Sequence, residues 1–139
     1  MADPIVLVLD DDPFDQTLIA SAFERVGSAA HIDLVSDVAS ALARFADGPT
    51  PTMALVDLKL AGESGLDFVQ ALRADQRTRY VPAVMLSGSD DPRDHRAAYD
   101  VGANAFVVKP SSLGAIDDLV KRLDAFWIGA VPAGPLSGR

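Results

Sequence analysis

The chain has no cysteine among its 139 residues and has few basic side chains. Without cysteine it can form neither disulfides nor thiolate metal sites, which fits a reducing compartment and predicts a cytoplasmic protein. Twelve Lys and Arg against twenty Asp and Glu give a formal net charge of −8, so nucleic acids and anionic membranes would repel it. No apolar run is long enough to span a bilayer, and the start of the chain lacks the basic flank of a signal peptide. We therefore expect neither a nucleic-acid partner nor a membrane partner.

Apolar runs typical of buried parallel strands alternate with stretches of helical periodicity. Capping residues mark several helix starts, as where Asp12 precedes Pro13. The pattern predicts five strands, at about 5–9, 31–35, 53–56, 83–87 and 105–109. Between and after them it predicts five helices, which begin near 13, 38, 64, 92 and 113. This alternation predicts an α/β fold: a doubly wound five-stranded parallel sheet in the flavodoxin-like order 2-1-3-4-5, with helices on both faces. We expect one domain over residues 1–128 and a flexible Gly/Pro-rich tail over 129–139.

Charged side chains stand where three of the predicted strands end. Asp10 and Asp11 follow the first strand, Asp57 follows the third, and Lys109 ends the fifth. The carboxyl ends of parallel strands meet at one edge of a sheet, where such folds bind ligands. Carboxylates with waters suit Mg²⁺, and a lysine offers a fixed positive charge to a phosphoryl or carboxylate oxygen. In such surroundings Asp57 can attack a phosphorus centre and form an aspartyl phosphate.

The turn after the first strand contains no glycine. Dinucleotide-binding folds use a glycine-rich turn at this point to approach a pyrophosphate. Here the turn is Asp10-Asp11-Asp12-Pro13, and its negative charge would repel that ligand. We reject a dinucleotide-binding fold for this reason.

One set of residues at the strand ends resembles the receiver domain of two-component response regulators: Asp10-Asp11, Asp57, Ser87 and Lys109-Pro110. The resemblance covers about residues 4 to 127. It implies that Asp57 accepts a phosphoryl group from a sensor histidine kinase or a histidine phosphotransfer protein, in a Mg²⁺-dependent reaction. Asp11 would bind Mg²⁺ directly and Asp10 directly or through water. Asp57 would be a further ligand, and Lys59 would offer its backbone carbonyl.

The same resemblance assigns roles around the acceptor. Ser87 would bond a phosphoryl oxygen, Lys109 would pair with the phosphoryl group, and Phe106 would be the aromatic whose rotamer follows phosphorylation. It also implies a cis peptide bond between Lys109 and Pro110. The chain departs from the family at Ala61, where proline is usual, and at Ser87, where threonine is commoner. Neither departure removes a required group, so we expect a working phosphorylation site.

The end of the chain resembles a subgroup of this family. GANAFVVKPSSL, followed by a helix that ends in Asp124-Ala125-Phe126-Trp127, is similar to stand-alone receivers that serve phytochrome-type photoreceptor kinases. This similarity implies a homodimer built partly on the last helix, with Phe126 and Trp127 in its interface. Consecutive helical positions point about 100° apart, so we expect one large side chain to stay exposed in a monomer. We expect output through protein contacts, with no catalysis beyond self-phosphorylation and dephosphorylation.

Other residues and functions have simpler interpretations. We assign Asp12 and Asp15 to a helix cap and a first-turn charge without a catalytic role, and we expect His31 and His95 to be structural or exposed. A hydrolase of the haloacid dehalogenase type would need an acid two residues after its nucleophile, where this chain has Lys59. A phosphorylation-independent interaction module on the same fold stays open as the alternative.

Overall fold

A computed structural model describes residues 3–129 of the chain. Over that range, five parallel strands form one sheet in the order β2-β1-β3-β6-β7. The strands are β1 (Ile5–Leu9), β2 (His31–Val35), β3 (Met53–Asp57), β6 (Ala83–Ser87) and β7 (Ala105–Val108). The predicted flavodoxin-like order and the doubly wound α/β class are confirmed. The predicted tail, apart from Gly129, lies outside the described residues.

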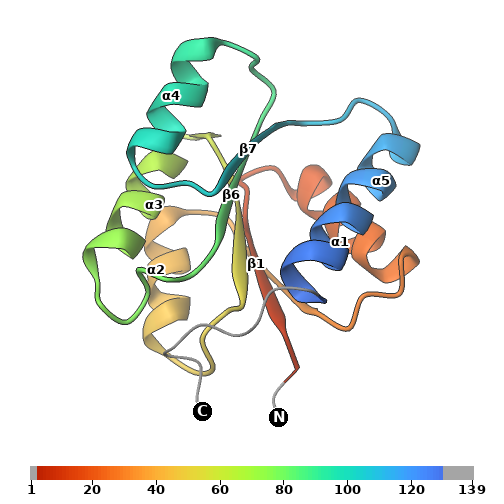
Figure 1. Ribbon diagram of the computed structural model, residues 1–139, viewed down its shortest axis with the longest axis horizontal. Helices are drawn as coiled ribbons and strands as arrows, with labels where there is room; N and C mark the ends of the chain where they lie inside the picture. Colours follow the sequence, from red (N-terminus) through yellow and green to blue (C-terminus); the bar gives the residue numbers. More distant parts are fainter. Residues whose placement is uncertain (1–2, 130–139) are drawn as a thin grey trace.

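In the described part of the chain, five α-helices cover the two faces of this sheet (Figure 1). On one face lie α1 (Pro13–Arg25) and α5 (Leu113–Leu123), and on the other lie α2 (Val38–Ala46), α3 (Gly65–Ala74) and α4 (Pro92–Asp100). Each helix begins after a residue whose side chain accepts a hydrogen bond from a first-turn backbone N–H: Asp12, Asp37, Ser64, Asp91 and Ser112. Across residues 3–129, no helix is both long and apolar enough to cross a membrane.

The side chains of the central strands alternate between two hydrophobic clusters. Leu7 and Leu9 of β1 point to the side of α2 and α3, where they join the fully buried Phe68. Val6 and Val8 point to the side of α1 and α5, where they join Phe23. Because both faces are covered, β1 and β3 consist almost wholly of buried apolar residues. This rigid centre holds the strand ends, and the charged residues on them, in fixed positions.

A short antiparallel hairpin follows Asp57, between the predicted third strand and the predicted third helix, where no strand was expected. Its strands are β4 (Lys59–Leu60) and β5 (Glu63–Ser64). The turn between them contains Gly62, whose φ of +73° lies in the left-handed region that favours glycine. Two-residue strands are too short for their alternation to be read from sequence, which is why the pattern did not indicate them.

The last helix continues past α5 as a π-helical segment, η1 (Asp124–Ile128). Trp127 is partly buried against the core cluster on the α1 and α5 side. Phe126 points away from that core with 56% of its surface exposed, and its ring meets the Trp127 ring edge-on at 4.9 Å. The prediction that one large side chain stays exposed in a monomer is therefore confirmed.

Candidate functional site

The loop between β1 and α1 holds two adjacent aspartates in different environments. Asp10 is buried, and its Oδ1 accepts a hydrogen bond from the Asp12 backbone N–H at 2.9 Å, whereas Asp11 is exposed. The buried Gln16 amide donates to the Asp10 carbonyl oxygen at 2.7 Å and to the Val35 carbonyl oxygen at 2.9 Å. Gln16 thus fixes the loop on the ends of β1 and β2. Sequence reasoning missed this residue, because a search for apolar residues at helical spacing does not detect a buried polar side chain.

Asp57 ends β3, and the start of α3 packs against the backbone at this strand end. The Gly65 backbone N–H donates to the Leu58 carbonyl oxygen at 2.9 Å, which brings α3 directly against the strand end. A Cβ at position 65 would overlap the Asp57 carbonyl oxygen and the Val56 side chain. Only glycine fits this close approach. The Asp57 carboxylate therefore stands at a backbone position that two elements fix together.

The three predicted metal-ligating carboxylates come together at this edge. Oxygens of Asp10, Asp11 and Asp57 all lie within 4.8 Å of one another. An all-oxygen set of this charge is the donor chemistry that hard divalent cations such as Mg²⁺ prefer, so the residues fit such an ion. The Asp11 Oδ2 also accepts the Ala61 backbone N–H of the hairpin turn at 2.7 Å. The Lys59 backbone N–H, at the other end of the hairpin, lowers the pKa of the Asp57 carboxyl group.

Lys109 reaches this cluster from the end of β7. Its ammonium nitrogen lies 3.1 Å from Asp10 Oδ2 and 3.2 Å from Asp57 Oδ2. The predicted cis bond to Pro110 is wrong, because no peptide bond in residues 3–129 is cis. The lysine backbone N–H instead donates to the Ser87 carbonyl oxygen at 2.7 Å, which extends the β6–β7 pairing by one residue. That bond aims the side chain at the carboxylates without a cis peptide.

Asp15 is a third partner of Lys109: it lies in the first turn of α1, as expected, but it also forms an ion pair that the sequence interpretation did not foresee. Its Oδ2 lies 2.9 Å from the Lys109 nitrogen, the shortest of the three contacts. A signal was present in the sequence: Asp15 precedes Leu18 and Ile19 by three and four positions, so it shares their helix face. Ile19 is buried against the sheet. A charge on such a face needs a partner, and Lys109 supplies it.

The charges of the site change the protonation of its members. Burial raises the pKa of Asp57 to about 6, and repulsion from Asp10 adds to the rise, while Lys109 and the Lys59 N–H counteract it. Burial disfavours the charged Lys109 ammonium, but the hydrogen bond to Asp15 and the charges of Asp57 and Asp10 outweigh it and raise the pKa of this lysine. Four carboxylates, Asp11 included, face one ammonium. The site therefore carries an excess of negative charge that a cation would relieve.

Ser87 and Phe106, the predicted switch residues, lie on the neighbouring strands β6 and β7. Ser87 is buried at the end of β6, and its hydroxyl oxygen accepts the Ser89 backbone N–H at 3.0 Å. Phe106 is half-buried on β7, and its ring centroid lies 4.2 Å from that of His95 on α4. His95 also approaches Asp90 at 3.2 Å. It is therefore a packing residue of the β7–α4 contact, as expected, while His31 is exposed on β2.

Comparison with known proteins agrees with this arrangement. The profile of the response regulator receiver domain family matches residues 6–123. The probable methanogenesis regulatory protein FilR2 of Methanothrix harundinacea is 32% identical over 133 residues, which cover 91% of this chain and 86% of FilR2.

Two solved structures share the fold over nearly their whole length. The phosphorylated cyanobacterial phytochrome response regulator RcpA is 25% identical, with a TM-score of 0.86 and coverage of 95% of this chain and 99% of RcpA. The Mn²⁺-bound form of response regulator Rcp1, a protein of Synechocystis, is 20% identical, with a TM-score of 0.83 and coverage of 94% and 99%. At that identity Rcp1 supports the fold alone.

Receiver domains act as signalling switches rather than as metabolic enzymes, bind a divalent metal in an acidic site, and work with histidine kinases or phosphotransfer proteins. The acidic site described above lies at the strand ends that such a domain uses, within the segment that the family profile matches. The chain belongs to the response regulator receiver domain family.

Proposed function

We propose that this chain is a phosphorylatable switch of a two-component phosphorelay, with Asp57 as the phosphoacceptor. The observation that carries the proposal is the meeting of Asp10, Asp11 and Asp57 with Lys109 at one edge of the sheet. A crowd of acids destabilises a fold unless a cation binds it. The arrangement therefore favours a binding role over a purely structural one.

The proposed reaction moves a phosphoryl group from a histidine to an aspartate. An oxygen of Asp57 forms the new bond to phosphorus, and the phosphorus–nitrogen bond of the donor phosphohistidine breaks. The electron pair of that bond stays on the histidine ring, which then takes up a proton. Asp57 stands at the end of a buried strand and its Oδ2 contacts the Lys109 ammonium, so its carboxylate is held in position for this attack.

The metal that we propose is Mg²⁺, held by Asp10, Asp11 and Asp57 with the Lys59 backbone carbonyl. When bound, such an ion supplies positive charge that offsets the acids and the developing charge on the phosphoryl oxygens. Among the residues of the chain, Lys109 contributes a second positive charge at a fixed position. Ser87, whose hydroxyl lies at the neighbouring strand end, would donate its hydrogen to a phosphoryl oxygen while its oxygen still accepts the Ser89 backbone N–H.

Phe106 is positioned to carry the signal outward. Its backbone N–H donates to the Tyr99 hydroxyl at 3.2 Å, and its ring packs on His95, so β7 and α4 meet through this residue. A rotation of the Phe106 side chain would change the exposed surface of α4 and β7. We propose that this surface, together with the exposed Phe126 at the end of the last helix, forms contacts with other proteins, including a second copy of this chain.

A sensor histidine kinase or a histidine phosphotransfer protein is the proposed donor. The name of RcpA associates that relative with a phytochrome, which supports a photoreceptor kinase as the input for this chain as well. We expect the exchange to take place in the cytoplasm.

Intact-mass spectrometry after incubation with acetyl phosphate and Mg²⁺ tests the proposal. The wild type should gain one phosphoryl group, which is lost at alkaline pH, and the Asp57→Asn protein should gain none. Asp118→Asn, an exposed aspartate on α5, is the matched control and should be modified like the wild type. Equal modification of Asp57→Asn would refute the acceptor, and no modification of the wild type would favour the phosphorylation-independent interaction module.

A further inference from the structure

Asp15 takes part in the site without belonging to its predicted metal set. It lies in the first turn of α1, and its carboxylate meets the Lys109 ammonium at 2.9 Å. An ammonium group has three N–H donors, and Asp10, Asp57 and Asp15 are the three acceptors within bonding distance. The described contacts therefore use the full donor capacity of Lys109.

The three partners of Lys109 differ in what a metal would do to them. Asp10 and Asp57 belong to the group of carboxylates whose oxygens lie within 4.8 Å of one another, together with Asp11. Within residues 3–129, Asp15 is not part of that group. A cation among the grouped carboxylates would offset the charge of Asp10 and Asp57 but leave Asp15 free to hold the lysine. Asp15 is thus the partner that would compete with an incoming phosphoryl group.

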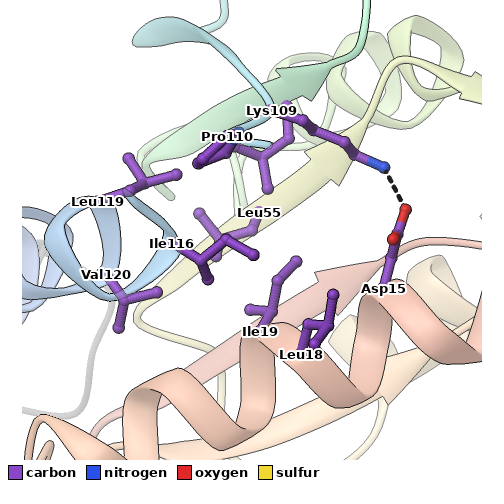
Figure 2. Close-up of a pocket in the computed structure, with 10 residues that line it drawn as sticks. Asp15, Leu18, Ile19, Leu55, Lys109, Pro110, Ile116, Leu119 and Val120 are labelled. Atoms are coloured by element: carbon purple, nitrogen blue, oxygen red, sulfur yellow. Dashed lines mark hydrogen bonds and ion pairs between the residues drawn. The ribbon is translucent and has the colours of Figure 1, made fainter. Parts of the chain in front are cut away.

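The position of Lys109 does not depend on Asp15 alone. Its backbone N–H is fixed to the Ser87 carbonyl oxygen at 2.7 Å. Its side chain lines a pocket of about 70 Å³ between α1 and α5, together with the adjoining Pro110 and with Leu18 and Ile116. Figure 2 shows Lys109 and Asp15 pointing toward each other at one end of this apolar pocket. Loss of the Asp15 charge would therefore release a donor without displacing the lysine.

We propose that Asp15 is a positioning residue that restrains Lys109 and thereby slows phosphorylation of Asp57. By holding one N–H of the ammonium toward α1, it withholds that donor from the phosphoryl oxygens, and its own charge opposes the approach of an anionic donor. The Asp15–Lys109 pair also joins α1 to the loop before α5. Transfer of the lysine to the phosphoryl group would open this contact. The inference rests on the proposed function and adds a restraint to it.

The test compares initial rates of phosphorylation by acetyl phosphate at saturating Mg²⁺, read by intact mass. In this reaction an Asp57 oxygen bonds to phosphorus, and the phosphorus–oxygen bond to acetate breaks. An ion pair of this exposure contributes up to about 1 kcal/mol, so Asp15→Asn should react about two- to fivefold faster than the wild type. Asp15→Ser should show the same increase. Asp15→Glu, which restores the carboxylate, should return to the wild-type rate.

Asp67→Asn is the matched control, because Asp67 is an exposed aspartate in the first turn of α3 and lies outside the site. It should leave the rate unchanged. An unchanged or slower rate in both neutral Asp15 variants, with melting curves that show folded protein, would overturn the inference. So would a rate in Asp15→Glu as fast as in Asp15→Asn. Failure of the wild type itself to be phosphorylated would instead refute the proposed function, so the two failures can be told apart.

Discussion

Replacing Asp57, the proposed acceptor, with asparagine should stabilise the metal-free protein at neutral pH. Burial and Asp10 raise the pKa of Asp57 from 3.8 to about 6 in the folded state. The folded state then binds a proton more tightly than the unfolded chain does, so the free energy of unfolding falls as the pH rises through this range. Asparagine has nearly the shape of the protonated carboxyl group and no charge to lose. The free energy of unfolding of the variant should therefore not show this decrease with pH.

The magnitude follows from the two pKa values. One pKa unit corresponds to about 1.4 kcal/mol, so the change from 3.8 to about 6 amounts to at most about 3 kcal/mol above pH 7. At pH 5 the folded wild type is mostly protonated at this position, and the advantage of the variant should shrink to about half that value. Below pH 4 it should vanish. For a domain of this size, the advantage at pH 7 should raise the melting temperature by roughly 10 °C.

Urea unfolding in the presence of EDTA, at pH 7 and at pH 5, measures both quantities. The control is Asp118→Asn, whose exposed side chain should change the free energy of unfolding by less than about 0.5 kcal/mol at either pH. If Asp57→Asn were no more stable than the wild type at pH 7, burial would not raise the pKa of Asp57 as the structure indicates. An advantage of equal size at both pH values would point to altered packing instead of ionisation.

Three further outcomes are expected. Mg²⁺ should raise the melting temperature of the wild type by mass action but hardly that of Asp11→Asn, which lacks an anionic ligand; equal shifts in calorimetry would contradict the role given to Asp11. Lys109→Ala should lower the free energy of unfolding in EDTA by about 3 kcal/mol, because three carboxylates lose their shared cation. Added Mg²⁺ should then raise the free energy of unfolding more in this variant than in the wild type. Phe126→Ala should weaken a homodimer, as measured by light scattering, without lowering the melting temperature of the monomer. Trp127→Ala should lower that temperature, because Trp127, unlike Phe126, packs on the core. A wild type that is monomeric at tens of micromolar would refute the homodimer.

The strands and the convergence of charged residues could be predicted from the sequence, because both follow from short-range patterns. A run such as residues 5–9 is apolar on both faces, which indicates a covered parallel strand. In such a sheet the strand ends are fixed by topology, so Asp10, Asp57 and Lys109 had to meet. No knowledge of side-chain conformations was needed for this step.

The contacts that the sequence did not reveal depend on side-chain directions and on loop geometry. Asp15 was assigned to the helix dipole, a sufficient role for an acid in a first turn, yet its position on the buried face also brings it to Lys109. The hairpin after Asp57 consists of strands too short to show a period. The cis bond at Pro110 came from resemblance alone, and in the structure the Lys109 backbone N–H already pairs with Ser87 in the trans form.

The hairpin also gives a physical meaning to the departure from the family at Ala61. Proline has no backbone N–H, so a proline here could not donate the 2.7 Å hydrogen bond that Ala61 makes to Asp11. Ala61 has a negative φ and precedes Gly62 at +73°, which is the pattern of a turn that accepts proline at this position. With alanine the turn is less rigid than it would be with proline, but the Ala61 backbone N–H binds one oxygen of Asp11.

That hydrogen bond and the Asp15–Lys109 pair act in the same sense. Each partly satisfies a charged group that the proposed reaction needs, Asp11 for the metal and Lys109 for the phosphoryl group. In the metal-free state these contacts offset part of the repulsion among the carboxylates. Where a metal or a phosphoryl group displaces one of these contacts, the free energy of that exchange lowers the apparent affinity of the site. The same few contacts therefore stabilise the resting form and make the site less ready to accept a phosphoryl group.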